Sequence, residues 1–202
     1  DIKYIQIERA MNMNNKNRAC KYTQEESNKA SKKETVDMNS GLDADVVFVF
    51  SCPGQEEKKN KKLCFGETGR NLDILIGYLN ESRPDIFKYK TRYDYRITNA
   101  SNIVHYKALT GDTEAGKSEL SNKENVTRLS LETKNSKYII CMGDKALYAI
   151  SLIDNLSGKM IKGEHLGNVH LNLTYSNVQG DSPINKRRER VKIIAKKILE
   201  QL

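Results

Sequence analysis

The residues most able to take part in catalysis or binding lie near apolar runs of the sequence. The acids Glu56 and Glu57 come shortly after the run VVFVF, the amide of Asn99 ends the stretch YRITN, and His165 lies in the segment GEHLGN. A positioned carboxylate can hold or activate water, and a histidine can stabilise negative charge on a leaving group. An amide can read the edge of a nucleobase while an aromatic ring such as Phe65 stacks on its face. Together these groups suit a site that binds a base and stabilises charge on it.

Each of these residues also has a structural interpretation. Glu56 and Glu57 are explained equally well by a solvated acidic step beside the lysines that follow them. Asn99 is explained by a turn-capping amide, Phe65 by packing in the core, and His165 by an ordinary position in a loop. The functional interpretation is favoured by their common placement after predicted strands.

Four stretches of the sequence are typical of strands. The run Val46 to Phe50 is continuous and β-branched, as in a strand buried on both faces, and further strands are predicted at residues 94–101, 137–142 and 168–175. Helical patterns lie between them, which predicts an α/β domain with a mostly parallel sheet. Such sheets place their sites at the carboxyl ends of the strands. We therefore expect the loops after these strands to meet, together with the loops that flank the last strand, including the segment GEHLGN.

Helix boundaries are predicted from capping residues and apolar stripes. Thr68 is the predicted cap of a helix with Leu72, Leu75, Ile76 and Leu79 on one stripe, and Ser182 with Pro183 is predicted to begin the last helix. The stripe of that last helix comprises Ile184, Val191, Ile194, Ile198 and Leu202. A helix is also expected around residues 122–133, and residues 107–123 look like a long polar loop. The first 41 residues are polar, with one helix predicted at IKYIQIERAM.

The chain is strongly basic, with 34 lysines and arginines against 26 acids and a formal net charge of +8. An excess of this size indicates a polyanionic partner such as nucleic acid, although an inert basic surface would look the same. The charge gathers in two places: Lys58, Lys59, Lys61 and Lys62 in one loop, and Lys186, Arg187, Arg188, Arg190 and Lys192 in the last helix. No apolar run approaches the ~20 residues of a membrane span, so we expect a cytoplasmic protein.

Metal and cofactor chemistry finds little support in the sequence. The four cysteines form no C-x-x-C pair, which argues against a zinc ribbon, an iron–sulfur cluster and a disulfide scaffold. Buried free thiols are the expected alternative. Three isolated histidines supply no metal centre, so neither metal nor cofactor is predicted.

A weak nucleotide-binding signal lies in the stretch LTGDTEAGKSEL. Gly111, Gly116, Lys117 and Ser118 have the spacing of a phosphate-binding loop. Such a loop must follow a buried strand and open a helix, and neither pattern flanks this stretch. An α/β nucleotide-binding domain therefore stands as a minor alternative.

Over roughly residues 45–202, the sequence resembles the uracil-DNA glycosylase superfamily. In the classical branch, a strand is followed by Gly-Gln-Asp-Pro-Tyr-His, and a base-stacking phenylalanine comes thirteen residues after the aspartate. Here Cys52-Pro53-Gly54 holds the Asp-Pro-Tyr place, and LCF ends at Phe65, the same thirteen residues on. RITNASN is similar to the strand whose asparagine reads the base, which assigns that role to Asn99. GEHLGNVHLN stands at the family's histidine motif, which indicates His165, with His170 as the weaker candidate.

Two departures from the family pattern are informative. Cys52 replaces the water-activating aspartate, and Glu57 falls where the iron–sulfur branch carries an acid, so the resemblance makes Glu57 the candidate for that role. Gly54 replaces the tyrosine that closes the classical pocket against the C5 substituent of thymine. This opening admits larger C5 groups, although some branches with glycine here still take uracil. The cluster cysteines of the iron–sulfur branch are absent.

The resemblance implies a three-layer α/β/α sandwich with a central, mostly parallel four-stranded sheet, forming a single domain over residues 1–202. It implies a DNA glycosylase that acts as a monomer, flips a pyrimidine from the duplex and leaves an abasic site. The substrate would be uracil or a C5-modified cytosine, such as the glucosylated hydroxymethylcytosine of phage DNA, which would make the protein a phage-defence enzyme. Expected roles are catalysis by Glu57, Asn99 and His165, base binding by Cys52, Gly54, Phe65 and Asn99, and backbone contacts by Ser51, Lys58, Lys59, Lys61 and Lys62. The alternative is a non-catalytic nucleic-acid-binding domain on the same fold.

Overall fold

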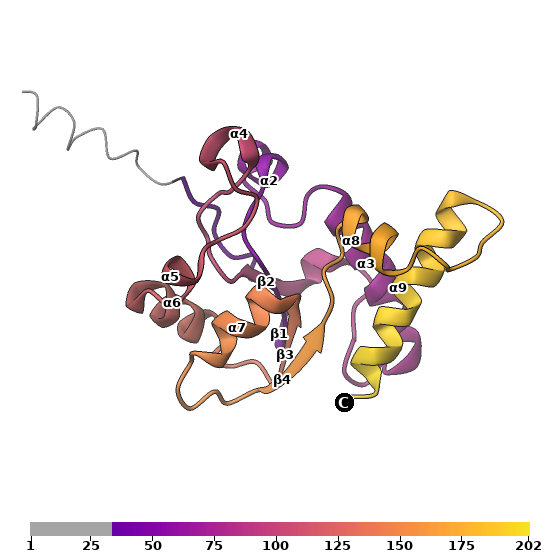
Figure 1. Cartoon of the computed structure of the whole chain (residues 1–202). Helices are drawn as coiled ribbons and strands as arrows, with labels where there is room; N and C mark the ends of the chain where they lie inside the picture. Colours follow the sequence, from indigo (N-terminus) through magenta and orange to yellow (C-terminus); the bar gives the residue numbers. More distant parts are fainter. Residues whose placement is uncertain (1–33) are drawn as a thin grey trace, which may run out of the picture. The chain divides into compact units, whose positions relative to one another are not determined.

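Four parallel strands in the order β2-β1-β3-β4 lie at the centre of residues 34–202, the part of the chain that this computed structural model describes (Figure 1). The strands are β1 (Asp43–Phe50), β2 (Tyr95–Asn99), β3 (Tyr138–Met142) and β4 (Lys159–Gly163). The prediction of an α/β fold with a parallel four-stranded sheet is confirmed. The helix predicted at IKYIQIERAM lies outside the described residues.

The central position of β1 explains why its sequence is apolar throughout. It pairs in parallel with β2 on one side and with β3 on the other, so its backbone groups are satisfied within the sheet. Val46, Phe48 and Phe50 face one core cluster while Val47 and Val49 face the other, and all five are at most 4% exposed. A strand buried on both faces admits no charged residue between Val46 and Phe50.

Helices cover both faces of the sheet and complete three layers. Helices α3 (Glu67–Ser82) and α9 (Pro183–Leu199) pack on the face that carries Phe48, whereas α6 (Lys123–Thr133) and α7 (Asp144–Ser151) pack on the other. Figure 1 shows α7 and α9 on opposite sides of the strands. The shorter helices are α2 (Gln55–Asn60), α4 (Lys107–Thr110), α5 (Lys117–Leu120) and α8 (Asn168–Thr174), with a 3₁₀ turn at Arg92–Asp94.

The last strand was wrongly predicted. Residues 168–175 form helix α8 rather than a strand, and the fourth strand is β4, nearer the N-terminus. The alternation of Val169, Leu171 and Leu173 suggested a sheet, yet only Leu171 is buried, while Val169 and Leu173 are 74% and 75% exposed. Strand β4 lies at the edge of the sheet and is rich in lysine, a composition typical of protected edges and weak as a strand signal.

Three smaller predictions are also corrected. The cap of α3 is Gly66 rather than Thr68, which lies in the first turn. The loop predicted at residues 107–123 contains the short helices α4 and α5. Ile184 is 63% exposed and so does not belong to the buried stripe of α9, whereas Val191, Ile194 and Ile198 do. Ser182 caps α9 as predicted, with its hydroxyl accepting the Asn185 N–H at 3.2 Å.

Within the described residues, no helix has the length and apolar composition needed to cross a bilayer.

The different burial of Leu75 in α3 and Ile184 in α9 predicts that their substitution by alanine changes the free energy of unfolding to different extents. Leu75 is fully buried, so Leu75→Ala should lower the free energy of unfolding by about 2–5 kcal/mol through lost burial and a residual cavity. Ile184→Ala, at an exposed site, should change it by less than about 0.5 kcal/mol. Urea titration of both variants measures the difference. Equal destabilisation would show that α9 buries its first turn as the sequence pattern suggested.

Candidate active site

A cavity of about 260 Å³ opens at the carboxyl ends of the strands. Six of the predicted site residues meet there, because the strands that precede them end at the same edge of the sheet. The full lining comprises Phe50, Ser51, Cys52, Gly54, Glu57, Cys64, Thr68, Asn99, Thr113, Glu114 and His165. The position of Ser51 in this lining places it beside the predicted base-binding residues.

Glu57 is the acid of the pair that lines the cavity, whereas Glu56 is exposed and is not part of the lining. Its Oε2 accepts the backbone N–H of Gly54 at 3.1 Å, which caps the start of α2. A Cβ on residue 54 would stand 3.2 Å from that same oxygen. Glycine therefore leaves the wall open and also lets the carboxylate approach the backbone.

Cys52 supplies a neutral group to the cavity. Burial raises the pKa of its thiol to about 11, and the S–H donates to the carbonyl oxygen of Thr113 at 3.6 Å. The thiol therefore stays protonated at neutral pH and carries no negative charge. Any anionic role in this cavity falls to the carboxylates of Glu57 or Glu114, both of which belong to the lining.

Asn99 presents an amide to the cavity from the end of β2. The residue is only 4% exposed, and its side-chain amide has no hydrogen-bond partner within residues 34–202. Its backbone is fixed by Arg128 of α6, whose Nη2 donates to the carbonyl oxygen of Asn99 at 2.9 Å. Arg128 is itself held by Glu132 at 2.6 Å. A buried amide on a rigid backbone with unused donors and acceptors is suited to binding a polar ligand.

The neutral ring of His165 is held in one tautomer by its own loop. The backbone N–H of Gly167 donates to Nδ1 at 2.9 Å, so the proton of the neutral ring lies on Nε2. Burial lowers the pKa of His165, and the nearby His170 lowers it further. The ring is therefore a neutral donor through Nε2. A Cβ at Gly167 would come within 2.8 Å of the ring, so a larger residue at this position would force the ring to move.

The loop that carries His165 is anchored from α3. Asn71 is fully buried, and its Nδ2 donates to the carbonyl oxygen of Leu166 at 2.7 Å and to Oδ1 of Asn168 at 3.1 Å. This positioning role could not be predicted from the sequence, because an asparagine within an amphipathic helix is indistinguishable from a surface residue. His170, the weaker candidate, pairs with Glu164 at 3.3 Å and lies outside the 260 Å³ cavity.

Thr113 and Glu114 line the cavity although the sequence offered no reason to expect them. They precede Ala115, which is buried in the core. The segment is tied down by Glu119 of α5, which accepts from Ser101 and lies 3.0 Å from Nε2 of His105. This brings a loop that follows no strand to the mouth of the site. Gly111 ends helix α4, so the loop resembling a phosphate-binding motif has no strand before it.

Phe65 and the four lysines of the first loop lie outside this lining. Phe65 is 44% exposed, so its stacking role stays a prediction, while Phe50 is the aromatic residue of the lining. The lysines differ in their surroundings: Lys58 pairs with Glu34 at 2.9 Å, and the Lys62 ammonium lies 3.6 Å from the centroid of the Tyr93 ring. Lys59 and Lys61 are exposed.

A second, larger cavity of about 1010 Å³ adjoins the first. The two share Ser51, Thr113, Glu114 and His165. The larger one also carries ionic side chains that include Lys145, Lys162 and Glu164, together with the exposed apolar residues Val169 and Leu173 of α8. A ligand in the smaller cavity therefore has room to extend in this direction.

No protein-family model matches the chain, and no curated protein matches it either. Among residues 34–202, no three His, Cys, Asp or Glu side chains come together as metal ligands.

The burial of the His165 ring predicts how it titrates. Its pKa in the folded protein should lie below the ordinary value of about 6.5, so the unfolded chain binds the proton more tightly. This contribution to the free energy of unfolding is present above about pH 6.5 and is lost as the pH falls. In Gly167→Ala the added Cβ should displace the ring into solvent and raise the pKa, as followed by NMR titration of the imidazole.

Gly77→Ala is the matched control, because a Cβ at this helical position meets no atom within 4 Å. It should leave the titration of His165 unchanged. An unshifted pKa in Gly167→Ala would contradict the proposed constraint on the ring.

Proposed function

We propose that this protein is a DNA glycosylase resembling the uracil-DNA glycosylase superfamily, which flips a pyrimidine nucleotide and hydrolyses its N-glycosidic bond. The observation that carries the proposal is the convergence of Glu57, Asn99 and His165 on one cavity of about 260 Å³. This volume lies below the roughly 300–1,000 Å³ of pockets that hold drug-sized ligands, which suits a single ring. The net charge of +8 suits a DNA partner.

Each of the three residues has a chemical role that its surroundings support. The unpartnered amide of Asn99 binds the Watson–Crick edge of the flipped base. The Nε2–H of His165 donates to the base as it leaves with the electron pair of the broken C1′–N bond. Glu57 positions a water molecule, which adds to C1′ and gives up a proton, and the carboxylate also favours the cationic sugar.

The substrate that fits best is a cytosine with a bulky C5 group, such as glucosylated hydroxymethylcytosine. Two observations support it over uracil: Gly54 leaves the wall of the small cavity open, and the cavity of about 1010 Å³ adjoins it through four shared residues. Carboxylates and ammonium groups such as Glu114, Lys145 and Lys162 suit the hydroxyls of a sugar. A base of this kind belongs to phage DNA, so the enzyme would act in defence.

Helix α8 offers a group to fill the gap that a flipped nucleotide leaves. Val169 and Leu173 are four residues apart on one face of the helix, and both are largely exposed at the rim of the larger cavity. Apolar side chains of this type insert between base steps in many DNA-bending proteins. These two side chains belong to the helix that follows the loop of His165.

The first experiment identifies the excised base. The protein is incubated with two labelled duplexes, one with uracil and one with glucosylated hydroxymethylcytosine, and alkali then cleaves abasic sites. We expect cleavage of the modified strand. Cleavage of the uracil strand alone would indicate a repair enzyme with an unusual first motif. If neither strand is cleaved while DNA is bound, the alternative of a non-catalytic nucleic-acid-binding domain holds.

The second experiment assigns the catalytic carboxylate. Glu57→Gln should reduce the rate of excision by about 10²–10⁴, because general acid–base catalysis contributes a factor of this size, while DNA affinity is retained. Glu56→Gln is the matched control and should leave the rate unchanged, since Glu56 lies outside the lining. Single-turnover kinetics and binding titrations measure the two effects. Loss of activity in Glu114→Gln alone would move the role to Glu114.

A further inference from the structure

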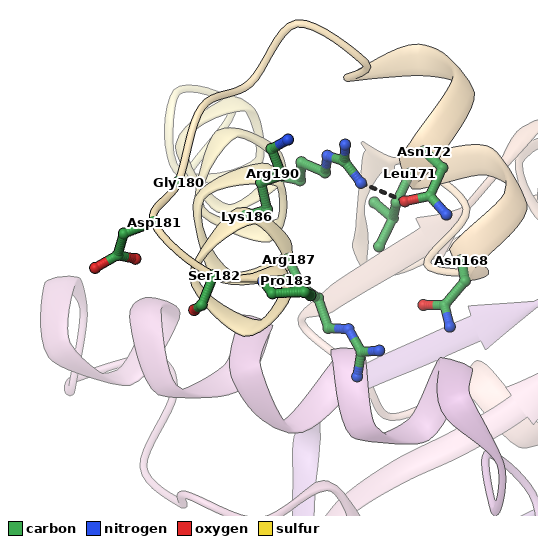
Figure 2. Close-up of a pocket in the computed structure, with 10 residues that line it drawn as sticks. All are labelled: Asn168, Leu171, Asn172, Gly180, Asp181, Ser182, Pro183, Lys186, Arg187 and Arg190. Atoms are coloured by element: carbon green, nitrogen blue, oxygen red, sulfur yellow. Dashed lines mark hydrogen bonds between the residues drawn. The ribbon is translucent and has the colours of Figure 1, made fainter.

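A third cavity, of about 420 Å³, lies between α8 and the first half of α9. It has no lining residue in common with the 260 Å³ cavity and shares only Asn168 with the larger one. Three cations face it from a single helix: Lys186, Arg187 and Arg190 (Figure 2). The rest of the lining is Asn168, Leu171, Asn172, Gly180, Asp181, Ser182 and Pro183.

The two arginines are held in place by the protein. Nε of Arg190 donates to the carbonyl oxygen of Tyr175 at 3.0 Å, and Nη1 donates to Oδ1 of Asn172. Nη1 of Arg187 lies 3.2 Å from Oε2 of Glu67. Figure 2 shows the two guanidinium groups leaving α9 on the side where Asn168 lies. Cations fixed in this way lose little conformational entropy when they bind an anion.

The charge balance of the cavity is positive. Within the described residues, Lys186 forms no ion pair, and Asp181 is the one carboxylate in the lining. Asp181 is exposed and bonds to the side-chain amide of Asn185. In Figure 2 its carboxylate points away from Arg187 and Arg190. The open space is therefore bordered by hydrogen-bond donors with positive charge, the chemistry that recognises a phosphate.

We infer that this cavity binds a backbone phosphate of the DNA strand on which the enzyme acts, an inference that takes its DNA partner from the proposed function. The three cavities adjoin one after another. The 260 Å³ cavity shares four lining residues with the 1010 Å³ cavity, which shares Asn168 with the basic 420 Å³ cavity. A DNA strand with one nucleotide in the 260 Å³ cavity would continue past the basic cavity. Arg187 and Lys186 then neutralise a phosphate that keeps the strand in register.

The test compares two double variants of the same helix. Lys186→Gln with Arg187→Gln removes two cations from the cavity, and Arg188→Gln with Lys196→Gln removes the same charge from exposed positions outside it. Binding of a labelled duplex is measured by anisotropy between about 50 and 200 mM salt. The cavity variant should bind about tenfold more weakly, and its slope of log affinity against log salt should be smaller by about one. The control variant should match the wild type, and circular dichroism checks that both are folded.

Each outcome bears on a separate claim. Equal weakening in the two variants would mean that only overall charge matters, which overturns the inference, and so would unchanged binding in the cavity variant or no binding of DNA by the wild type. Inorganic phosphate added at constant ionic strength should displace the duplex from the wild type more than from the cavity variant. Phosphate that binds without displacing the duplex would identify a free-anion site instead and overturn the inference. Loss of affinity in the cavity variant without any base excision would leave this site standing while the proposed function fails.

Discussion

The parallel pairing of β1 with its two neighbours is the constraint from which the site follows. Phe50 pairs with Asn99 at the end of β2, and Met142 pairs with Gly163 where β3 and β4 end. All four strands therefore release their chains at one edge of the sheet, directly before Ser51, Gly143 and the loop that carries His165. A strand that ran antiparallel would send one of these loops to the opposite edge and separate the carboxylate, amide and imidazole.

Polar side chains from the covering helices then fix the loops that the sheet brings together. Arg128 of α6 holds the backbone at Asn99, and Asn71 of α3 holds the loop after His165. Glu119 of α5 holds the segment that precedes α5 and carries Glu114. In the first two cases a buried or half-buried donor satisfies carbonyl groups that no strand can reach. The site is therefore preorganised by side chains that do not line it, which is how precise constellations are usually maintained.

Elements that depend on apolar periodicity could be predicted from the sequence, whereas features that depend on tertiary contacts could not. Strands β1, β2 and β3 and helices α3, α6 and α9 follow from apolar runs and stripes, and so does the meeting of Glu57 and Asn99. His165 also lies in this cavity, although the strand that precedes it was not predicted. Strand β4 was missed because an edge strand needs only one apolar face, so its lysines obscured the pattern. The contribution of Glu114 could not be predicted, because its place depends on contacts between separate segments, such as those of Glu119 with Ser101 and His105, rather than on local order.

Under the proposed function, a thiol at Cys52 in the cavity raises the question of which group supplies negative charge. Because burial raises the pKa of the Cys52 thiol to about 11, the thiol is neutral, and the proposed reaction would need a neighbouring carboxylate for negative charge. Glu57 already caps α2 through Oε2, yet a carboxylate has two oxygens, and within the described residues Oε1 has no partner. The cap fixes the carboxylate at the wall of the cavity and leaves the second oxygen for water. The cap at α2 is therefore compatible with the catalytic role proposed for Glu57, and the glycine at position 54 leaves room for the carboxylate at the backbone.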